Sequence, residues 1–203
     1  SGLQVLSVAS DLTMTMLGTI TLGSNDVNSV AVKNGVVAVA VASANKTDPG
    51  DVFFLDASAE LSVLGGIISP TDFVFTSVKV GALPDMLTFT ADGMKVLVAN
   101  EAEQNDVDGN NPPDLVNPEG SLSIIDLSPV MSENALVGAV PLVTTASFAA
   151  FNDKLVELKA AGVRLFAGEA GFTDITVAQD LEPEYISISP DGKTAFVTLQ
   201  ENN

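Results

Sequence analysis

A short hairpin unit occurs three times in this chain of 203 residues, and the repeat constrains the fold more than any other feature. In its clearest copy, apolar residues alternate through 186–188 and 195–197 on either side of Pro190-Asp191-Gly192. Such alternation is the period of a half-buried strand, and proline, aspartate and glycine are the residues that a tight turn uses. Related units have their turns at Asp92-Gly93 and Asn34-Gly35. We therefore expect a fold of repeated antiparallel hairpins.

Both earlier units continue in the same way after the hairpin. Strand 52–55 ends at Asp56, and strand 120–125 ends at Asp126. The next stretch supplies a fourth strand in each unit, from 61–64 with 73–80 in the first and from 136–143 in the second. Four antiparallel strands per repeat are typical of a β-propeller blade. The predicted fold class is therefore all-β, a β-propeller with about two and a half blades in this chain.

The repeat spacing predicts a single domain, a β-propeller fragment over residues 1–203. Its blade units lie at about 1–80, 81–145 and 178–203, and two strands joined near Ser10-Asp11 begin the first unit. A closed propeller takes about four to eight blades. We therefore expect the remainder of the propeller, another copy or another chain to cover the open edge.

A helical insertion is predicted at about 146–165. Phe148, Phe151, Leu155 and Leu158 recur at helical spacing, and Gly162 follows where a helix C-cap is expected. An amphipathic helix near 147–161 results, and its apolar stripe is more typical of core packing than of a ligand pocket.

Composition excludes several classes of function. The chain has 26 acidic and 8 basic residues, so its net charge of −18 argues against nucleic acid and anionic membranes as partners. Cation binding suits this charge, although simple solubility explains it equally well. Cys and His are absent, which leaves only oxygen ligands for a metal. No apolar run approaches the ~18 residues of a membrane helix, and without a signal-peptide pattern the chain is expected to be a mature or processed piece.

Seven carboxylates recur where strands of the repeat begin or end. The residues that enter the first strand of a propeller blade lie at the mouth of the central channel, and antiparallel neighbours bring one strand's end beside the next strand's start. A ring of such groups would bind a hard cation, with Ca²⁺ as the expected cofactor because it tolerates six to eight oxygen ligands. An ordinary solvated rim is the alternative. The candidate ligands are Asp85, Glu101, Glu103, Glu119, Glu182, Glu184 and Glu201, with Asn100 and Asn202 as additional donors.

Three other motifs are weaker. Residues 104–110 resemble an EF-hand loop, but Leu115 falls where the bidentate glutamate is needed, so only an irregular Ca²⁺ loop or a solvated turn remains. Asn45-Lys46-Thr47 fits the N-glycosylation pattern. Arg164 is the sole arginine, and beside a carboxylate-held Ca²⁺ it could position a phosphoester.

Two blocks of sequence resemble a known family. One covers 81–103 with 118–127, and the other covers 163–166 with 178–203, where Asp180-Leu181-Glu182-Pro183-Glu184-Tyr185 is the most specific string. They resemble the choice-of-anchor I family of bacterial surface and secreted β-propellers, which includes mesenchyme-specific cell-surface glycoprotein-like sequences. Some members are described as atypical alkaline phosphatases. Family members are longer, so the resemblance implies a fragment.

Composition and resemblance together give two hypotheses and leave enzymatic activity open. The first is an extracellular, periplasmic or cell-surface propeller module that binds Ca²⁺ and acts as a structural or interaction component. The alternative is a metal-dependent phosphoesterase of the alkaline phosphatase or phytase type, with Ca²⁺ at the channel mouth.

Overall fold

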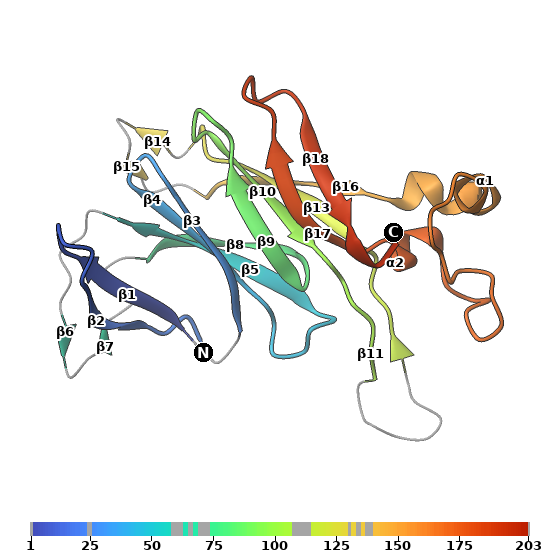
Figure 1. Ribbon diagram of the computed structural model, residues 1–203, viewed down its shortest axis with the longest axis horizontal. Coiled ribbons are helices and arrows are strands. Elements are labelled where there is room, and N and C mark those ends of the chain that lie inside the picture. The colour runs from blue at the N-terminus through green and yellow to red at the C-terminus, as the bar shows by residue number, and fades with distance from the viewer. Residues whose placement is uncertain are drawn as a thin grey trace.

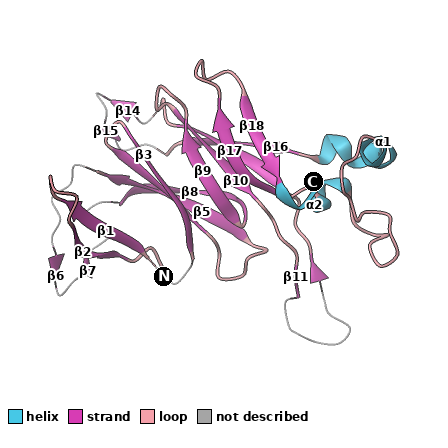
Figure 2. Cartoon of the chain, viewed as in Figure 1, coloured by secondary structure: helices cyan, strands magenta, loops and turns pink. Residues whose placement is uncertain are grey.

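The protein was analysed as a computed structural model, and its strands form several sheets beside a small helical region (Figure 1). The structure describes residues 2–23, 26–57, 63–64, 67–68, 74–106, 115–129, 131–132, 135–136 and 140–202. Strands dominate and helices are short (Figure 2). The all-β prediction is confirmed.

Two complete sheets have four strands each, antiparallel and in chain order, as the repeat predicted. The first contains β3 (Val27–Lys33), β4 (Val36–Val41), β5 (Pro49–Asp56) and β8 (Val74–Ala82). The second contains β9 (Pro84–Phe89), β10 (Lys95–Asn100), β13 (Ser121–Asp126) and β16 (Leu142–Ser147). The expected strand 136–143 is therefore shifted, because β16 begins only at Leu142; residues 137–139 lie outside the described residues.

The remaining strands form smaller or less regular sheets. A third hairpin pairs β17 (Pro183–Ile188) with β18 (Ala195–Leu199). Near the N-terminus the sheet order is β1-β2-β7-β6, with β2 and β7 parallel. Its strands are β1 (Leu3–Val8), β2 (Met14–Ile20), β6 (Val63–Leu64) and β7 (Ile67–Ile68). Residues 63–64, expected beside 73–80, pair with β7 instead. Two short hairpins join β11 (Asn105–Asp106) to β12 (Leu115–Val116) and β14 (Met131–Ser132) to β15 (Ala135–Leu136).

The turns of the second and third hairpins have the same pattern of hydrogen bonds. The Thr90 hydroxyl donates to Asp92 Oδ1 at 2.6 Å and accepts from the Lys95 N–H at 3.0 Å. At the equivalent positions, the Ser189 hydroxyl donates to Asp191 Oδ1 at 2.7 Å and accepts from the next strand's N–H at 3.0 Å. These hydroxyls lower the pKa of both aspartates. The glycines that follow have φ of +75° and +68°, which explains the Asp-Gly signature.

The first strands of the two complete sheets lie side by side, and their contacts join equivalent positions of the repeat. Ser29 Oγ accepts from the Leu87 N–H, and Asn34 Nδ2 donates to the Asp92 carbonyl. Both bonds span 58 residues, which is also the spacing of the first two turn glycines. Strand β9 contacts β3 on one side and β17 on the other. Neighbouring units therefore meet through the same surfaces.

Aliphatic side chains fill the space between sheets. One core lies between the two complete sheets and includes Val52, Phe54, Val96, Val98 and Ile125, all 0% exposed. A second core joins β4 and β5 to the N-terminal sheet through Val39, Val41, Leu55, Ile20 and Ile68. The strands β4 and β5 are buried on both faces, which explains their nearly continuous apolar sequence.

The predicted helix is present in two parts. A 3₁₀ segment, η2 (Ala149–Lys154), leads into α1 (Leu155–Ala160). The Val163 N–H donates to the Leu158 carbonyl and the Gly162 N–H to the Lys159 carbonyl, while Gly162 has φ of +95°. This is a Schellman C-cap, as the glycine predicted. Phe148, Leu155 and Leu158 pack, partly buried, on a small core that contains Leu165, Val177 and Leu181. Phe151 of the predicted stripe is 43% exposed, so the packing role holds for only part of it.

The shared turn network predicts unequal losses of stability. Thr90 is 7% exposed, so the variant Thr90→Val leaves buried polar groups without partners and is expected to lower the free energy of unfolding by about 1–2 kcal/mol. Ser189→Ala removes the same bonds where water can replace them and should cost less than about 0.5 kcal/mol. Urea unfolding of both variants measures the difference; equal losses would contradict a role for burial.

Candidate cation site

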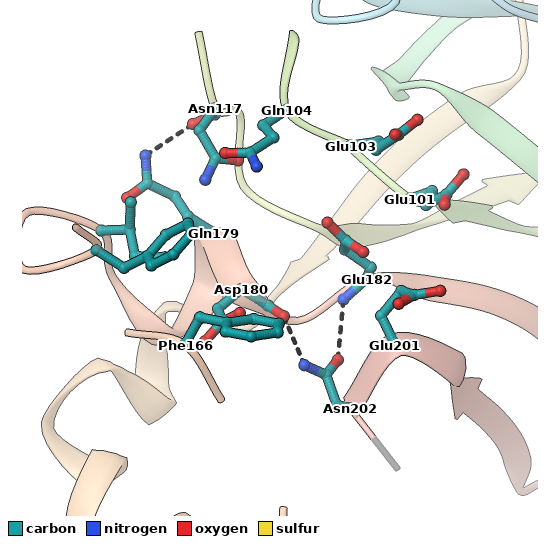
Figure 3. Close-up of a pocket in the computed structure, with 12 residues that line it drawn as sticks. Glu101, Glu103, Gln104, Asn117, Phe166, Gln179, Asp180, Glu182, Glu201 and Asn202 are labelled. Atoms are coloured by element: carbon teal, nitrogen blue, oxygen red, sulfur yellow. Dashed lines mark hydrogen bonds between the residues drawn. The ribbon is translucent and has the colours of Figure 1, made fainter. Parts of the chain in front are cut away.

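A pocket of about 460 Å³ opens where the ends of β10 and β18 meet the start of β17. Figure 3 shows carboxylates from these three places facing a common space, with aromatic and amide side chains on the opposite side. The acidic wall is formed by Glu101, Glu103, Glu182 and Glu201. The other wall is formed by Phe166, Phe172, Ile175, Gln104, Asn117 and Gln179, with Asp180 and Asn202 at the base.

The electrostatics of the acidic wall are unfavourable. Burial, followed by the charges of Asp85 and Glu184, raises the pKa of Glu101 from its ordinary value of 4.5 to about 7. Burial, followed by the charges of Glu201 and Glu103, raises the pKa of Glu182 to about 7 as well. Both carboxyls are half-buried, so near neutral pH each is only partly ionised.

Asp85 and Glu184 extend the cluster beyond the pocket lining. Burial raises the pKa of Asp85, and burial together with the nearby charge of Asp85 raises the pKa of Glu184. These residues occupy equivalent positions in β9 and β17, two strands that contact each other. The repeat therefore brings the two carboxylates close enough to interact electrostatically.

Cations within the protein neutralise only the rim of the cluster. Lys46 Nζ lies 2.7 Å from Glu103 Oε2, and Arg164 Nη2 lies 3.2 Å from Glu201 Oε2. The guanidinium of Arg164 also donates to the Glu201 carbonyl and lies 5.2 Å from the Phe166 ring centroid. Among the described residues no ion pair reaches Asp85, Glu101, Glu182 or Glu184.

Buried amide groups fix the backbone beneath Glu182. Asn202, 5% exposed, donates from Nδ2 to the carbonyls of Asp180 and Arg164, and its Oδ1 accepts from the Glu182 N–H at 3.3 Å. This asparagine lies in η3 (Gln200–Asn202), which directly follows β18. Figure 3 shows these bonds on both sides of Asn202. The backbone of Glu182 is therefore anchored, while its carboxylate forms no ion pair with any described residue.

A short capped helix directly before β17, α2 (Val177–Asp180), supplies part of the opposite wall. Thr176 and Gln179 form a reciprocal capping box, and Gln179 Nε2 also donates to the Asn117 carbonyl at 2.7 Å. The Asp180 carboxylate, 7% exposed, accepts from the Ala167 N–H at 2.9 Å. The wall is thus tied both to the loop before β13 and to the segment that carries Phe166.

Six of the seven predicted carboxylates belong to this cluster, whereas Glu119 is exposed and does not line the pocket. Of the two predicted asparagines, Asn202 lines the pocket but Asn100 does not; Asn100 is buried and donates to Ser121 and Ser123. No three acidic side chains of the described residues are arranged to hold a metal ion as they stand. The loop 104–110 lies outside the described residues from 107 onward.

Sequence reasoning did not identify the aromatic and amide wall. Phe166, Phe172 and Ile175 belong to the segment between the helix and the third hairpin, which has no counterpart in the other units. The signal available was that residues 166–177, which lie between the predicted insertion and the third unit, lead directly to the Asp180-to-Tyr185 string. Placement at the entry of a repeat unit puts an insertion beside the strand ends that carry the carboxylates.

Fold and site together define a class, an all-β repeat protein of antiparallel sheets with an acidic pocket at the strand ends. The chain belongs to the choice-of-anchor I domain family, whose model matches residues 1–203, and the resemblance seen in the sequence is confirmed. Membership of this family indicates a surface-associated module. A search of curated proteins finds no match. In the part of the chain that the structure describes, no helix has the length and apolar character to span a bilayer.

The raised carboxyl pKa values predict that the protein loses stability as pH rises from about 4.5 to about 7. In that range the unfolded chain releases protons that folded Glu101 and Glu182 retain, so the free energy of unfolding falls. The loss is roughly 1 kcal/mol for each group, because solvent screens both half-exposed carboxyls. Urea unfolding in EDTA at a series of pH values measures it.

Glu182→Gln is the informative variant, and it should flatten this slope and stabilise the protein at pH 8. Asp126 provides an internal reference, because Ser128 and Lys95 hold its pKa at about 2 and its effect appears only below about pH 4. An unchanged slope in the variant would show that Glu182 ionises normally.

Proposed function

We propose that this protein is a Ca²⁺-binding surface module with a structural or interaction role. The observation that carries the proposal is the set of four carboxylates, Asp85, Glu101, Glu182 and Glu184, that lie together without a cationic partner among the described residues. Burial first, and neighbouring acids second, raise the pKa values of this group, and a bound divalent cation would favour the ionised carboxylates.

The arrangement of sheets supports a propeller, in which each four-stranded sheet is a blade. The first strands β3, β9 and β17 lie next to one another in that order, and each begins a new antiparallel unit. Hydrogen bonds between equivalent positions of adjacent units are what rotation about a common axis produces. In such an arrangement, Asp85 and Glu184 lie at the entry of first strands and would face the channel mouth.

Ca²⁺ fits this site better than Mg²⁺. No three acidic side chains of the described residues are arranged to hold a metal ion as they stand, so binding requires these side chains to move. Ca²⁺ accepts irregular geometry and more oxygen ligands than Mg²⁺, which demands a near-ideal octahedron. Asn117 lines the same pocket, and its buried Oδ1 has no hydrogen-bond partner within the part of the chain that the structure describes. The rim residues Glu103 and Glu201 are exposed and able to move toward an ion. An affinity in the range of extracellular modules, about 10⁻⁴–10⁻³ M, is expected.

The alternative of a metal-dependent phosphoesterase has less support. Arg164, the only guanidinium in the chain, donates to the backbone and the carboxylate of Glu201 and lies against Phe166. Its Nε and Nη2 donors are therefore already used at the edge of the pocket. An acidic wall without a free arginine repels a phosphoester, so the binding role is the stronger proposal.

Calcium titration of variants tests the proposed function. Glu101→Gln and Glu182→Gln each remove a central ligand, and we expect each to weaken Ca²⁺ binding by about tenfold or more in isothermal titration calorimetry at pH 7.5. Glu119→Gln is the matched control, since it makes the same chemical change on an exposed residue outside the pocket. It should leave the affinity unchanged within about twofold.

The Ca²⁺ affinity should also change with pH, and its direction follows from the raised pKa values. Protons compete with Ca²⁺ for carboxyls whose pKa is about 7, so affinity should rise between pH 6 and pH 8. Equal weakening by all three variants, or no heat of binding up to millimolar Ca²⁺, would contradict the proposed site.

A further inference from the structure

The pocket at the strand ends is larger than a metal ion needs, and half of its wall is unsuited to one. Its volume of about 460 Å³ falls in the range of pockets that hold small organic molecules. Carboxylates line only one side (Figure 3), and the apolar part of the opposite wall consists of Phe166, Phe172 and Ile175. An ion held by oxygen atoms makes no use of such a wall. Size and lining together indicate a ligand with an apolar part.

The two aromatic rings of this wall are not part of the protein core. Phe166 and Phe172 contact each other with their ring centroids 5.5 Å apart, and neither belongs to the small core of the helical region. Phe166 is 39% exposed. The guanidinium of Arg164 lies 5.2 Å from the centroid of the Phe166 ring, so this aromatic pair already attracts one cation. The pair is therefore suited to a second cation on the side of the pocket.

The pocket has hydrogen-bond acceptors without partners, whereas two of its amide groups already use their donors. Gln179 Nε2 donates to the Asn117 carbonyl, and Asn202 Nδ2 donates to two backbone carbonyls. In contrast, the buried Asn117 Oδ1 has no hydrogen-bond partner in the described part of the chain. The carboxylates of Glu101 and Glu182 form no ion pair there either. A positively charged group with several N–H donors complements all three.

We propose that this pocket binds a primary ammonium group at the end of an aliphatic stem, as found in diamines and in lysine side chains. The ammonium group donates to the carboxylate of Glu182 and to Asn117 Oδ1, and the methylene groups of the stem pack on Phe172 and Ile175. The proposal goes beyond Ca²⁺ binding and does not rest on it, because the aromatic wall takes no part in holding the ion. Both ligands use Glu182, so Ca²⁺ is expected to compete with the amine.

Isothermal titration calorimetry of the intact 203-residue protein with 1,5-diaminopentane tests the proposal. The titration is done in EDTA at pH 7.5, so its result does not depend on Ca²⁺. We expect saturable binding with a Kd of about 1 mM or below. The neutral analogue 1,5-pentanediol has the same stem without the charge and should bind at least about tenfold more weakly.

Two variants assign the two ends of the ligand. Glu182→Gln removes the charge that faces the ammonium group and should weaken diamine binding about tenfold. Phe172→Ala removes the aromatic wall and should weaken it about fivefold; Phe172 lies outside the buried cores, so the variant is expected to fold. Phe196→Ala is the matched control, because Phe196 is 66% exposed and does not line the pocket. It should leave diamine binding unchanged within about twofold.

A second probe, Nα-acetyl-lysine-N-methylamide, distinguishes the two sources of such an amine. Binding as tight as that of the diamine would indicate a lysine side chain of a partner protein, and binding at least about tenfold weaker would indicate a free diamine. Three outcomes would overturn the proposal: no binding of either amine at millimolar concentration, equal binding of the diol and the diamine, or equal weakening by Phe172→Ala and Phe196→Ala. Any of these would leave the Ca²⁺ titrations unaffected, so the two proposals fail separately.

Discussion

Burial of carboxylates next to one another is the constraint on which the site depends. Glu101 and Glu182 lie half-buried among other acids, and burial first, with the neighbouring charges second, raises the pKa of each to about 7. Hydrogen bonds that do not involve the carboxylates themselves hold the surrounding backbone in place. Asn202 anchors the backbone of Glu182, and the capping box of Thr176 and Gln179 fixes the opposite wall. A rigid frame thus holds charges that would otherwise separate.

The repeat explains why the acids converge. Adjacent units meet through bonds between equivalent positions, from Asn34 to Asp92 and from Leu87 to Ser29. A residue type that recurs at one position of the unit is therefore placed next to its own counterpart. Asp85 and Glu184 are such a pair.

Most of the fold could be predicted from local signals, since Asx-Gly turns and alternating strands act over a few residues. The sheet of β1 and β2 was not foreseen as separate, because its partner strands β6 and β7 are too short to show a period. Glu119 was expected in the cluster and lies outside it. It precedes Gly120, where an added Cβ would lie 2.0 Å from the Leu181 carbonyl oxygen. This close approach of two distant segments is a tertiary contact that no local sequence pattern predicts. The aromatic wall was missed because insertions do not follow the repeat.

The central claim is that Glu101 and Glu182 stay partly protonated at neutral pH until a bound cation displaces their protons. Carbon-13 NMR of the side-chain carboxyls of Glu101 and Glu182, titrated between pH 4 and pH 9 with and without Ca²⁺, tests it most directly. We expect both to titrate near pH 7 in EDTA and well below that in saturating Ca²⁺. Titration near 4.5 in EDTA, or a midpoint that Ca²⁺ does not change, would contradict the account.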